Sequence, residues 1–198
     1  MQSTLPIRFG PAEGTAPLPR TLTGNAFLAI GATAFVAVCA HISVPLYFTP
    51  VPVTLQTLAV ILVGFALGPA LGFTAMTLYL AEGAMGLPVF SPHGPGGIAQ
   101  LIGPTAGYLF SYPLAAAVAA GVVRIAKAGR AQFSGAMVAG VAASAVIFTM
   151  GAGWFAVLLH LSPGAAWHMG VAPFLPYEVL KIAAAAGAYT SLRRWRQF

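Results

Sequence analysis

Charged residues are scarce in this sequence. They make up 6% of its 198 residues, whereas an ordinary soluble domain carries roughly 25%. Hydrophobic residues account for 59%, and the mean hydropathy is +0.87. Such a composition cannot cover a soluble surface with polar groups, so it excludes a soluble globular protein and indicates an integral membrane protein. The length leaves no room for a separate soluble catalytic module beside the membrane domain.

The sequence also has little from which a catalytic or metal centre could be built. Its single cysteine, Cys39, lies in an apolar run and can form no disulfide within the chain. The histidines His41, His160 and His168 have no cysteine or carboxylate at metal-ligand spacing. There is no serine in a nucleophile elbow and no phosphate-binding loop. We therefore expect no catalytic residue, no metal site and no cofactor, and we predict that the protein is not an enzyme.

Long apolar runs are abundant, and their lengths allow the chain to be divided into candidate transmembrane helices. A hydrocarbon core of about 30 Å requires roughly 20 helical residues, and segments rich in proline and glycine separate the candidate helices. We predict an all-α, polytopic membrane protein in which residues 25–198 form one domain of six transmembrane helices. The predicted spans are residues 25–43, 53–68, 70–87, 105–125, 134–161 and 173–192, with connections at 88–103 and 162–172.

The basic residues stand at the ends of these spans and form no patch, so nucleic acid is not an expected partner despite the net charge of +6. Short cytoplasmic loops of membrane proteins are enriched in lysine and arginine. With a cytoplasmic N-terminus, eight of the nine basic residues lie inside: Arg8, Arg20, Arg124, Lys127, Arg130, Arg193, Arg194 and Arg196. We predict that both termini are cytoplasmic, that residues 1–24 form a cytoplasmic tail, and that the protein spans the cytoplasmic (inner) membrane several times.

The ninth basic residue, Lys181, falls inside the last predicted span. A charged side chain at this depth costs roughly 2.5 to 3.5 kcal/mol on insertion scales, so it requires a partner or a polar cavity. Glu178 lies three residues earlier, on the same helix face. The two side chains could line a solute site, or they could only neutralise each other and fix helix packing. Glu82 could join a charge network with Lys181 or a histidine, or it could lie near the outer interface.

Two predicted outer connections have unusual backbone chemistry. Alternating prolines in residues 47–56 are typical of an extended chain, which could act as a lid before the second helix. Glycines in residues 88–97 allow a backbone to approach a ligand closely. Both segments could equally be ordinary surface turns. The small residues Ala29, Thr33 and Ala37 permit another helix to come close, either within the chain or in a partner subunit.

Five blocks of the sequence, in this order, resemble the BioY family. They are PVPVTLQT at 50–57, LGP at 67–69, GAMGLPVF at 83–90, GPTAGY at 103–108, and PFLP at 173–176, the last followed by Glu178 and Lys181. The resemblance covers most of the chain from about residue 25 onward. It implies a six-helix substrate-binding (S) component of an energy-coupling factor (ECF) transporter that captures biotin from outside with high affinity. It also implies membrane lipid, an energising transmembrane subunit and ATPase subunits as partners; a homo-oligomer is left open.

The resemblance implies that Glu178 and Lys181 contact biotin and that the segments around Gly94–Gly97 and Val53–Gln56 cover it. A pocket for biotin also needs apolar walls around its ring. The predicted substrate-binding residues are Glu178, Lys181, Gln56, Thr54, Phe90, Gly96, Gly97, Tyr108 and Phe174. The alternatives are an intramembrane enzyme, or a carrier for another small vitamin-like solute. A channel is not favoured, because the spans hold too few polar residues for a continuous pore.

Overall fold

The structure is a computed structural model that describes residues 21–126 and 132–195. The predicted tail up to residue 20, together with Lys127, Arg130 and Arg196, lies outside this part of the chain. The helices are α1 (Leu22–His41), α2 (Gln56–Leu67), α3 (Pro69–Ala84), α4 (Gly97–Leu101), α5 (Ala106–Ala126), α6 (Gln132–Leu158), α7 (Pro163–Gly170) and α8 (Leu175–Trp195), with a 3-10 turn, η1 (Ala172–Phe174), before α8. Two strands, β1 (Ser43–Leu46) and β2 (Thr49–Thr54), connect α1 to α2.

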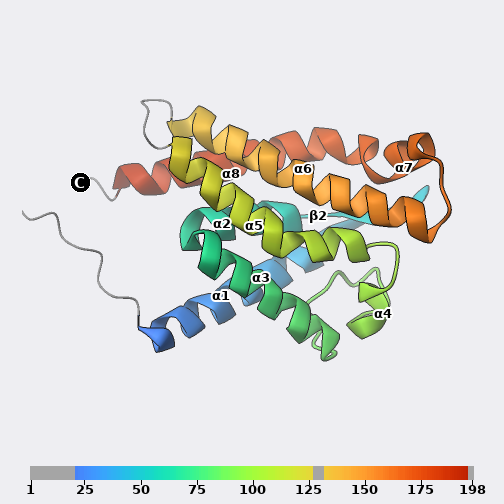
Figure 1. Ribbon diagram of the computed structural model, residues 1–198, viewed down its shortest axis with the longest axis horizontal. Coiled ribbons are helices and arrows are strands. Elements are labelled where there is room, and N and C mark those ends of the chain that lie inside the picture. Colours follow the sequence, from blue (N-terminus) through green and yellow to red (C-terminus); the bar gives the residue numbers. More distant parts are fainter. Residues whose placement is uncertain (1–20, 127–131, 196–198) are drawn as a thin grey trace, which may run out of the picture.

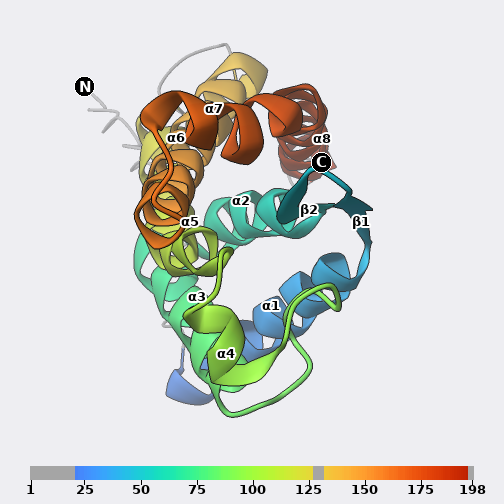
Figure 2. The same cartoon turned by 90° about the vertical axis from the view of Figure 1, so that its right-hand side faces the viewer.

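Helix α5 lies in the middle of the bundle and contacts α2, α3 and α6 (Figure 1). Helix α2 is surrounded by α1, α3, α5 and α8, and an end-on view shows it near the centre of the ring of helices (Figure 2). Alanine is the most frequent buried hydrophobic residue, and larger side chains such as Tyr79 and Phe155 pack between the alanines. Lipid tails are as apolar as these side chains, so close contact between small residues is what holds such helices together.

Glycines mark the points at which two helices come closest. A β-carbon at Gly64 on α2 would overlap the carbonyl oxygen of Ala116 on α5. A β-carbon at Gly140 on α6 would stand 2.6 Å from the Ile182 side chain on α8. In both cases the added β-carbon would lie closer to its neighbour than non-bonded atoms approach in proteins. The helices can therefore pack this closely only with glycine at these two positions.

The two ends of the helix bundle differ in the elements and residues that they carry. At the left of Figure 1, α1 begins, α2 turns into α3, and α5 and α8 end; we call this the basic end, because Arg124 lies in the last turn of α5 and Arg193 and Arg194 in the last turn of α8. The β1–β2 hairpin, α4 and α7 lie at the opposite end, which we call the hairpin end. The turn at the basic end uses Gly68, whose φ of +87° is readily adopted only by glycine.

The hairpin corrects the prediction of an all-α protein. Ser43 pairs with Thr54 and Leu46 with Thr49 in an antiparallel ladder, so the proline-rich segment is extended as predicted but is paired with a second strand. Proline is tolerated here because each strand of a two-stranded sheet has an unpaired edge. As a result, α2 begins at Gln56 and not at Val53.

Each predicted span overlaps one helix, and no predicted end differs from the observed one by more than three residues. Four helical segments in the described residues are long and apolar enough to cross a membrane: Leu22–His41, Ala106–Ala126, Gln132–Leu158 and Pro163–Trp195, the last comprising α7, η1 and α8. At a rise of about 1.5 Å per residue, the 12 residues of α2 and 16 of α3 reach only roughly 18 and 24 Å. The chain is a mostly helical, multi-pass membrane protein.

Two short helices lie in segments predicted to be connections. Helix α4 falls within residues 88–103, and α7 within residues 162–172. The side chain of Ser162 caps α7 by accepting a hydrogen bond from the Ala165 amide at 3.3 Å, and Pro163 occupies its first turn. Both short helices lie at the hairpin end of the bundle (Figure 1).

The close approach of α2 and α5 gives a test of the fold. We expect Gly64→Ala to lower the melting temperature of the purified protein in detergent, because overpacking a tight contact typically costs about 1 to 3 kcal/mol. Gly121→Ala, also in a helix, is the matched control, since no atom lies within 4 Å of a β-carbon there. Thermal unfolding followed by circular dichroism measures both. An unchanged melting temperature for Gly64→Ala would contradict the observed contact.

Candidate functional site

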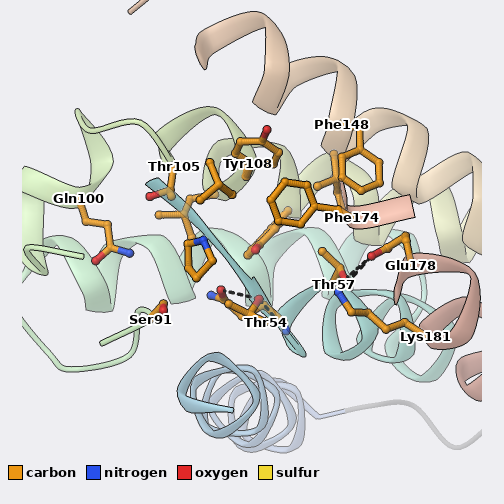
Figure 3. Close-up of a pocket in the computed structure, with 16 residues that line it drawn as sticks. Thr54, Thr57, Ser91, Gln100, Thr105, Tyr108, Phe148, Phe174, Glu178 and Lys181 are labelled. Atoms are coloured by element: carbon orange, nitrogen blue, oxygen red, sulfur yellow. Dashed lines mark hydrogen bonds and ion pairs between the residues drawn. The ribbon is translucent and has the colours of Figure 1, made fainter. Parts of the chain in front are cut away.

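A cavity opens between the hairpin and the helices toward the hairpin end of the bundle. It is lined by side chains from β2, α2, α5, α6, η1 and α8, with residues of the α3–α5 connection closing one side: Val51, Pro52, Thr54, Gln56, Thr57, Ser91, Gln100, Thr105, Tyr108, Leu109, Tyr112, Ile147, Phe148, Phe174, Glu178 and Lys181. Figure 3 shows the charged side chains at one end of this cavity and Gln100 and Thr105 at the other. The cavity therefore brings together side chains from segments that are far apart in the sequence.

The charged end of the cavity is a hydrogen-bonded triangle. The Lys181 ammonium lies 3.2 Å from Glu178 Oε2 and donates to Thr57 Oγ1 at 3.1 Å. The Thr57 hydroxyl in turn donates to the same carboxylate oxygen at 2.9 Å (Figure 3). The other oxygen, Glu178 Oε1, accepts from the Ser144 hydroxyl at 2.7 Å. Glu178 is 3% exposed and Lys181 8%, so three helices supply the partners that a buried pair requires.

The local sequence explains where the pair stands. Glu178 lies in the first turn of α8, where the positive end of the helix dipole stabilises a carboxylate. Lys181 follows on the same face one turn later, and both side chains point into the cavity rather than toward lipid (Figure 3). Both of the roles predicted for the pair, helix packing and a solute site, are compatible with this position.

Thr54 and Gln56 also line the cavity, but their polar atoms bind mainly to the protein. The Thr54 hydroxyl donates to Gln56 Oε1 at 3.2 Å, and Gln56 Nε2 donates to the Tyr79 hydroxyl at 2.8 Å. Tyr79 then donates to the Val89 carbonyl at 2.7 Å. This chain of bonds ties the β2–α2 junction to α3 and to the segment after it. It anchors the base of the hairpin, at the end of β2, beside the cavity.

Aromatic rings form the wall opposite the hairpin. Tyr108 and Phe174, both predicted, lie beside Phe148, and the Phe148 and Phe174 centroids are 6.4 Å apart (Figure 3). The Tyr108 hydroxyl donates to the Gly170 carbonyl at 2.7 Å, so its polar end is satisfied at the end of α7. Its ring occupies space that a β-carbon at Gly151 would fill. The wall therefore offers apolar ring faces without an unpaired polar group.

Three predicted binding residues lie outside the cavity lining. Phe90 is buried behind it, where it stacks edge-on against Tyr79 with centroids 5.5 Å apart. Gly96 and Gly97 precede α4 with positive φ of 70° and 57°, and the Gly96 amide donates to Gln100 Oε1 at 3.2 Å. The Gly96 amide thus helps to orient Gln100, which does line the cavity.

In the part of the chain that the structure describes, Glu82 forms no ion pair with Lys181 or with a histidine, the partners that the sequence suggested for it. Its Oε1 accepts a hydrogen bond from the Thr33 hydroxyl on α1 at 3.1 Å, and the single ion pair within residues 21–126 and 132–195 joins Lys181 to Glu178. The half-buried carboxylate therefore connects α3 to α1, away from the cavity. In the same described residues, no group of three His, Cys, Asp or Glu side chains is placed to hold a metal ion.

Sequence reasoning missed several polar residues of the site. Thr57 and Ser144 both bind Glu178, and each carries a hydroxyl into a mostly apolar helix. A hydroxyl inside a membrane helix needs a partner, and this requirement was the available signal. Ser91, Gln100 and Thr105 carried no comparable signal, since polar residues are expected in connections.

Because Glu178 and Lys181 form a buried ion pair, we expect replacement of one charge to destabilise the protein more than replacement of both. Glu178→Gln leaves the Lys181 charge buried without its counterion, and breaking a buried pair costs about 3 to 5 kcal/mol. We expect the double variant Glu178→Gln/Lys181→Met to unfold at a higher temperature than Glu178→Gln alone, because it buries no lone charge. Thermal unfolding in detergent of the wild type, both single variants and the double variant measures this. Additive losses would show that the two charges are independent.

Comparisons with known proteins agree with this architecture. The sequence model of the BioY family matches residues 13–198. The probable biotin transporter BioY of Pyrococcus horikoshii is 38% identical over 152 residues, which cover 77% of this chain and 85% of the relative. The biotin transporter BioY of Thermotoga maritima is 36% identical over 154 residues, covering 78% and 86%.

A solved structure shares the fold. The crystal structure of the S-component for biotin from an ECF-type ABC transporter aligns with a TM-score of 0.78. The alignment covers 87% of this chain and 92% of that one, at 22% sequence identity. The resemblance noted in the sequence is thereby confirmed over nearly the whole length. This chain belongs to the BioY family.

Proposed function

We propose that this chain captures biotin with high affinity from outside the cell, as the substrate-binding component of an ECF-type transporter in the cytoplasmic membrane. The observation that carries the proposal is a cavity in which a buried, hydrogen-bonded ion pair faces aromatic walls. Relatives that the chain matches over more than three quarters of its length are named biotin transporters. Biotin has the complementary chemistry: a compact ring system, a neutral ureido group and one carboxylate.

The hydrogen bonds left open by the ion pair suit a ureido group. A carboxylate has about four acceptor sites and an ammonium has three donors. Glu178 accepts from Ser144, Thr57 and Lys181, and Lys181 donates twice. About one acceptor site and one N–H then remain for a ligand. A ureido group has N–H donors beside a carbonyl oxygen, so Glu178 accepts from it while Lys181 donates to it.

The cavity must widen for biotin to enter. Its free volume is about 50 Å³, whereas sites for small molecules typically enclose roughly 300 to 1,000 Å³. The β1–β2 hairpin covers the cavity from one side and is the element that could move, because its strands pair only with each other. Its last residues, Val53 and Thr54, belong to the predicted lid. Binding at 1 nM corresponds to about 12 kcal/mol, so closure must leave few polar groups of the ligand unpaired.

The membrane arrangement that fits this role has six crossings and cytoplasmic termini. The basic end carries Arg124, Arg193 and Arg194, in accord with a cytoplasmic face. The cavity then lies toward the outside, where the solute arrives. A separate transmembrane subunit and ATPase subunits would supply energy, as expected for a chain that resembles an S-component of an ECF-type ABC transporter.

The two alternatives have less support. An intramembrane enzyme would need an acid or base free to react, but both oxygens of Glu178 already accept hydrogen bonds. A carrier for another vitamin-like solute would use the same cavity, so the choice between solutes rests on direct binding measurements.

Biotin titration tests the proposal. We expect the purified wild-type chain in detergent to bind biotin with a dissociation constant in the nanomolar range, and Glu178→Gln and Lys181→Ala to bind at least about tenfold more weakly, since hydrogen bonds to charged groups contribute about 1.5 to 3 kcal/mol. Glu82→Gln is the matched control, because it changes a half-buried carboxylate outside the cavity. Isothermal titration calorimetry measures all four. Wild-type protein that ignores micromolar biotin would refute the proposed function.

Cysteine labelling tests the topology. The native Cys39 is buried, so an introduced cysteine reports its own position. We expect a membrane-impermeant maleimide to label Gly164→Cys, exposed in α7, in intact cells. It should label Arg194→Cys, exposed in the last turn of α8, only after the cells are permeabilised. Labelling of Arg194→Cys in intact cells would place the basic end outside and exclude the proposed orientation.

A further inference from the structure

A second hollow adjoins the cavity on the side away from the ion pair. It has a volume of about 160 Å³ and is lined by Pro50, Pro52, Ser91, His93, Gly94, Pro95, Gln100, Gly103, Pro104 and Thr105. We call it the vestibule. Four of its residues also line the cavity, namely Pro52, Ser91, Gln100 and Thr105. These side chains form the boundary between the two spaces, and a ligand group that passes between them enters the vestibule.

The two ends of this combined space differ in charge. One end holds the Glu178–Lys181 pair. The residues that line the vestibule include no lysine, arginine, aspartate or glutamate, and its one ionisable group is the exposed His93. A ligand that reaches from the cavity into the vestibule therefore places one end beside a compensated ion pair and the other beside neutral groups.

Charge balance sets the direction of a biotin molecule in this space. A ligand carboxylate beside the pair would leave a net negative charge in a buried site, because Glu178 already neutralises Lys181 at 3.2 Å. A ureido group adds no charge and can both donate and accept there. The ring system therefore belongs at the ion pair, and the chain that carries the carboxylate belongs at the vestibule.

Two buried polar side chains stand where the chain of the ligand would leave the cavity. Ser91 is 6% exposed, and its hydroxyl has no hydrogen-bond partner in the structure. Gln100 is 3% exposed and uses its carbonyl oxygen to accept from the Gly96 amide. A hydroxyl can donate or accept, and a carboxamide has N–H donors. Such neutral groups can pair with the carbonyl oxygen and the N–H of an amide, and neither Ser91 nor Gln100 requires a negative charge on the ligand.

We propose that the site also accepts biotin whose carboxylate has been converted to an amide, as in biotinyl-lysine, with the amide between Ser91 and Gln100 and the added group in the vestibule. This inference rests on the proposed function, because it assumes that the cavity binds biotin. It extends the substrate class from the free vitamin to biotin amides. Amide formation removes the carboxylate charge, which has no counterion among the residues that line the vestibule.

Competition with radiolabelled biotin on the purified full-length chain tests the inference. We expect biotinyl-lysine to compete with an inhibition constant within about tenfold of that of biotin, since no ion pair is lost. Biotin methylated at a ureido nitrogen should compete at least about 100-fold more weakly, because its ring end can no longer donate to Glu178. Tight binding of biotin with amide binding more than about 100-fold weaker overturns this inference alone. Failure to bind biotin overturns the proposed function as well.

A variant of the vestibule localises the effect. His93 lines the vestibule but not the cavity, so His93→Trp narrows only the outer space. We expect it to weaken biotinyl-lysine by about tenfold or more while changing biotin affinity less than about threefold. The matched control is His168→Trp, which alters an exposed histidine on α7 that lines neither space. Equal loss of affinity for both ligands in His93→Trp would overturn the route through the vestibule.

Discussion

A buried ion pair inside an apolar helix bundle is the interaction on which the rest of this structure depends. Glu178 and Lys181 are tolerable at this depth only because hydroxyls from α2 and α6 complete their hydrogen bonds. That requirement draws three helices to one point and leaves a space beside them. The same bonds that make the charges acceptable to the bundle therefore define the polar end of the candidate site.

Small residues make the rest of that site possible. Tyr108 can lie flat in the wall because Gly151 leaves room for its ring and the Gly170 carbonyl accepts its hydroxyl. Gly83 does the same for Phe90, which supports Tyr79 from behind the cavity. Aromatic walls close to the backbone of neighbouring helices are rigid, and a rigid wall reduces the ordering cost of binding. In this bundle, glycines shape the walls of the candidate site as well as the contacts between helices.

The sequence predicted the helices well because membrane thickness and proline-rich breaks act locally. It also predicted that Lys181 has a partner, and Glu178 is that partner, since a lysine in an apolar run needs one whatever the fold. It did not predict the β1–β2 ladder, because pairing of Ser43 with Thr54 depends on two segments meeting in space. It placed Phe90 in the cavity, whereas the ring packs behind Tyr79; both positions are buried, and hydrophobicity alone cannot separate them. Thr57 was missed because its value lies in a contact 121 residues away.

Ligand binding at such a site must compete with the bonds that stabilise the empty bundle. Thr57 is the residue at which this competition is least costly. Its hydroxyl donates to Glu178 and accepts from Lys181, so it can rotate and give up one bond while keeping the other. A ligand that supplies both a donor and an acceptor can take over whichever bond is released, and the charges then remain fully paired throughout. A ligand with only acceptors, such as a carboxylate, cannot replace the donor to Glu178 and would leave that carboxylate under-satisfied in a buried site. The bonds that hold the pair before any ligand arrives therefore predict a preference for a neutral group that both donates and accepts hydrogen bonds.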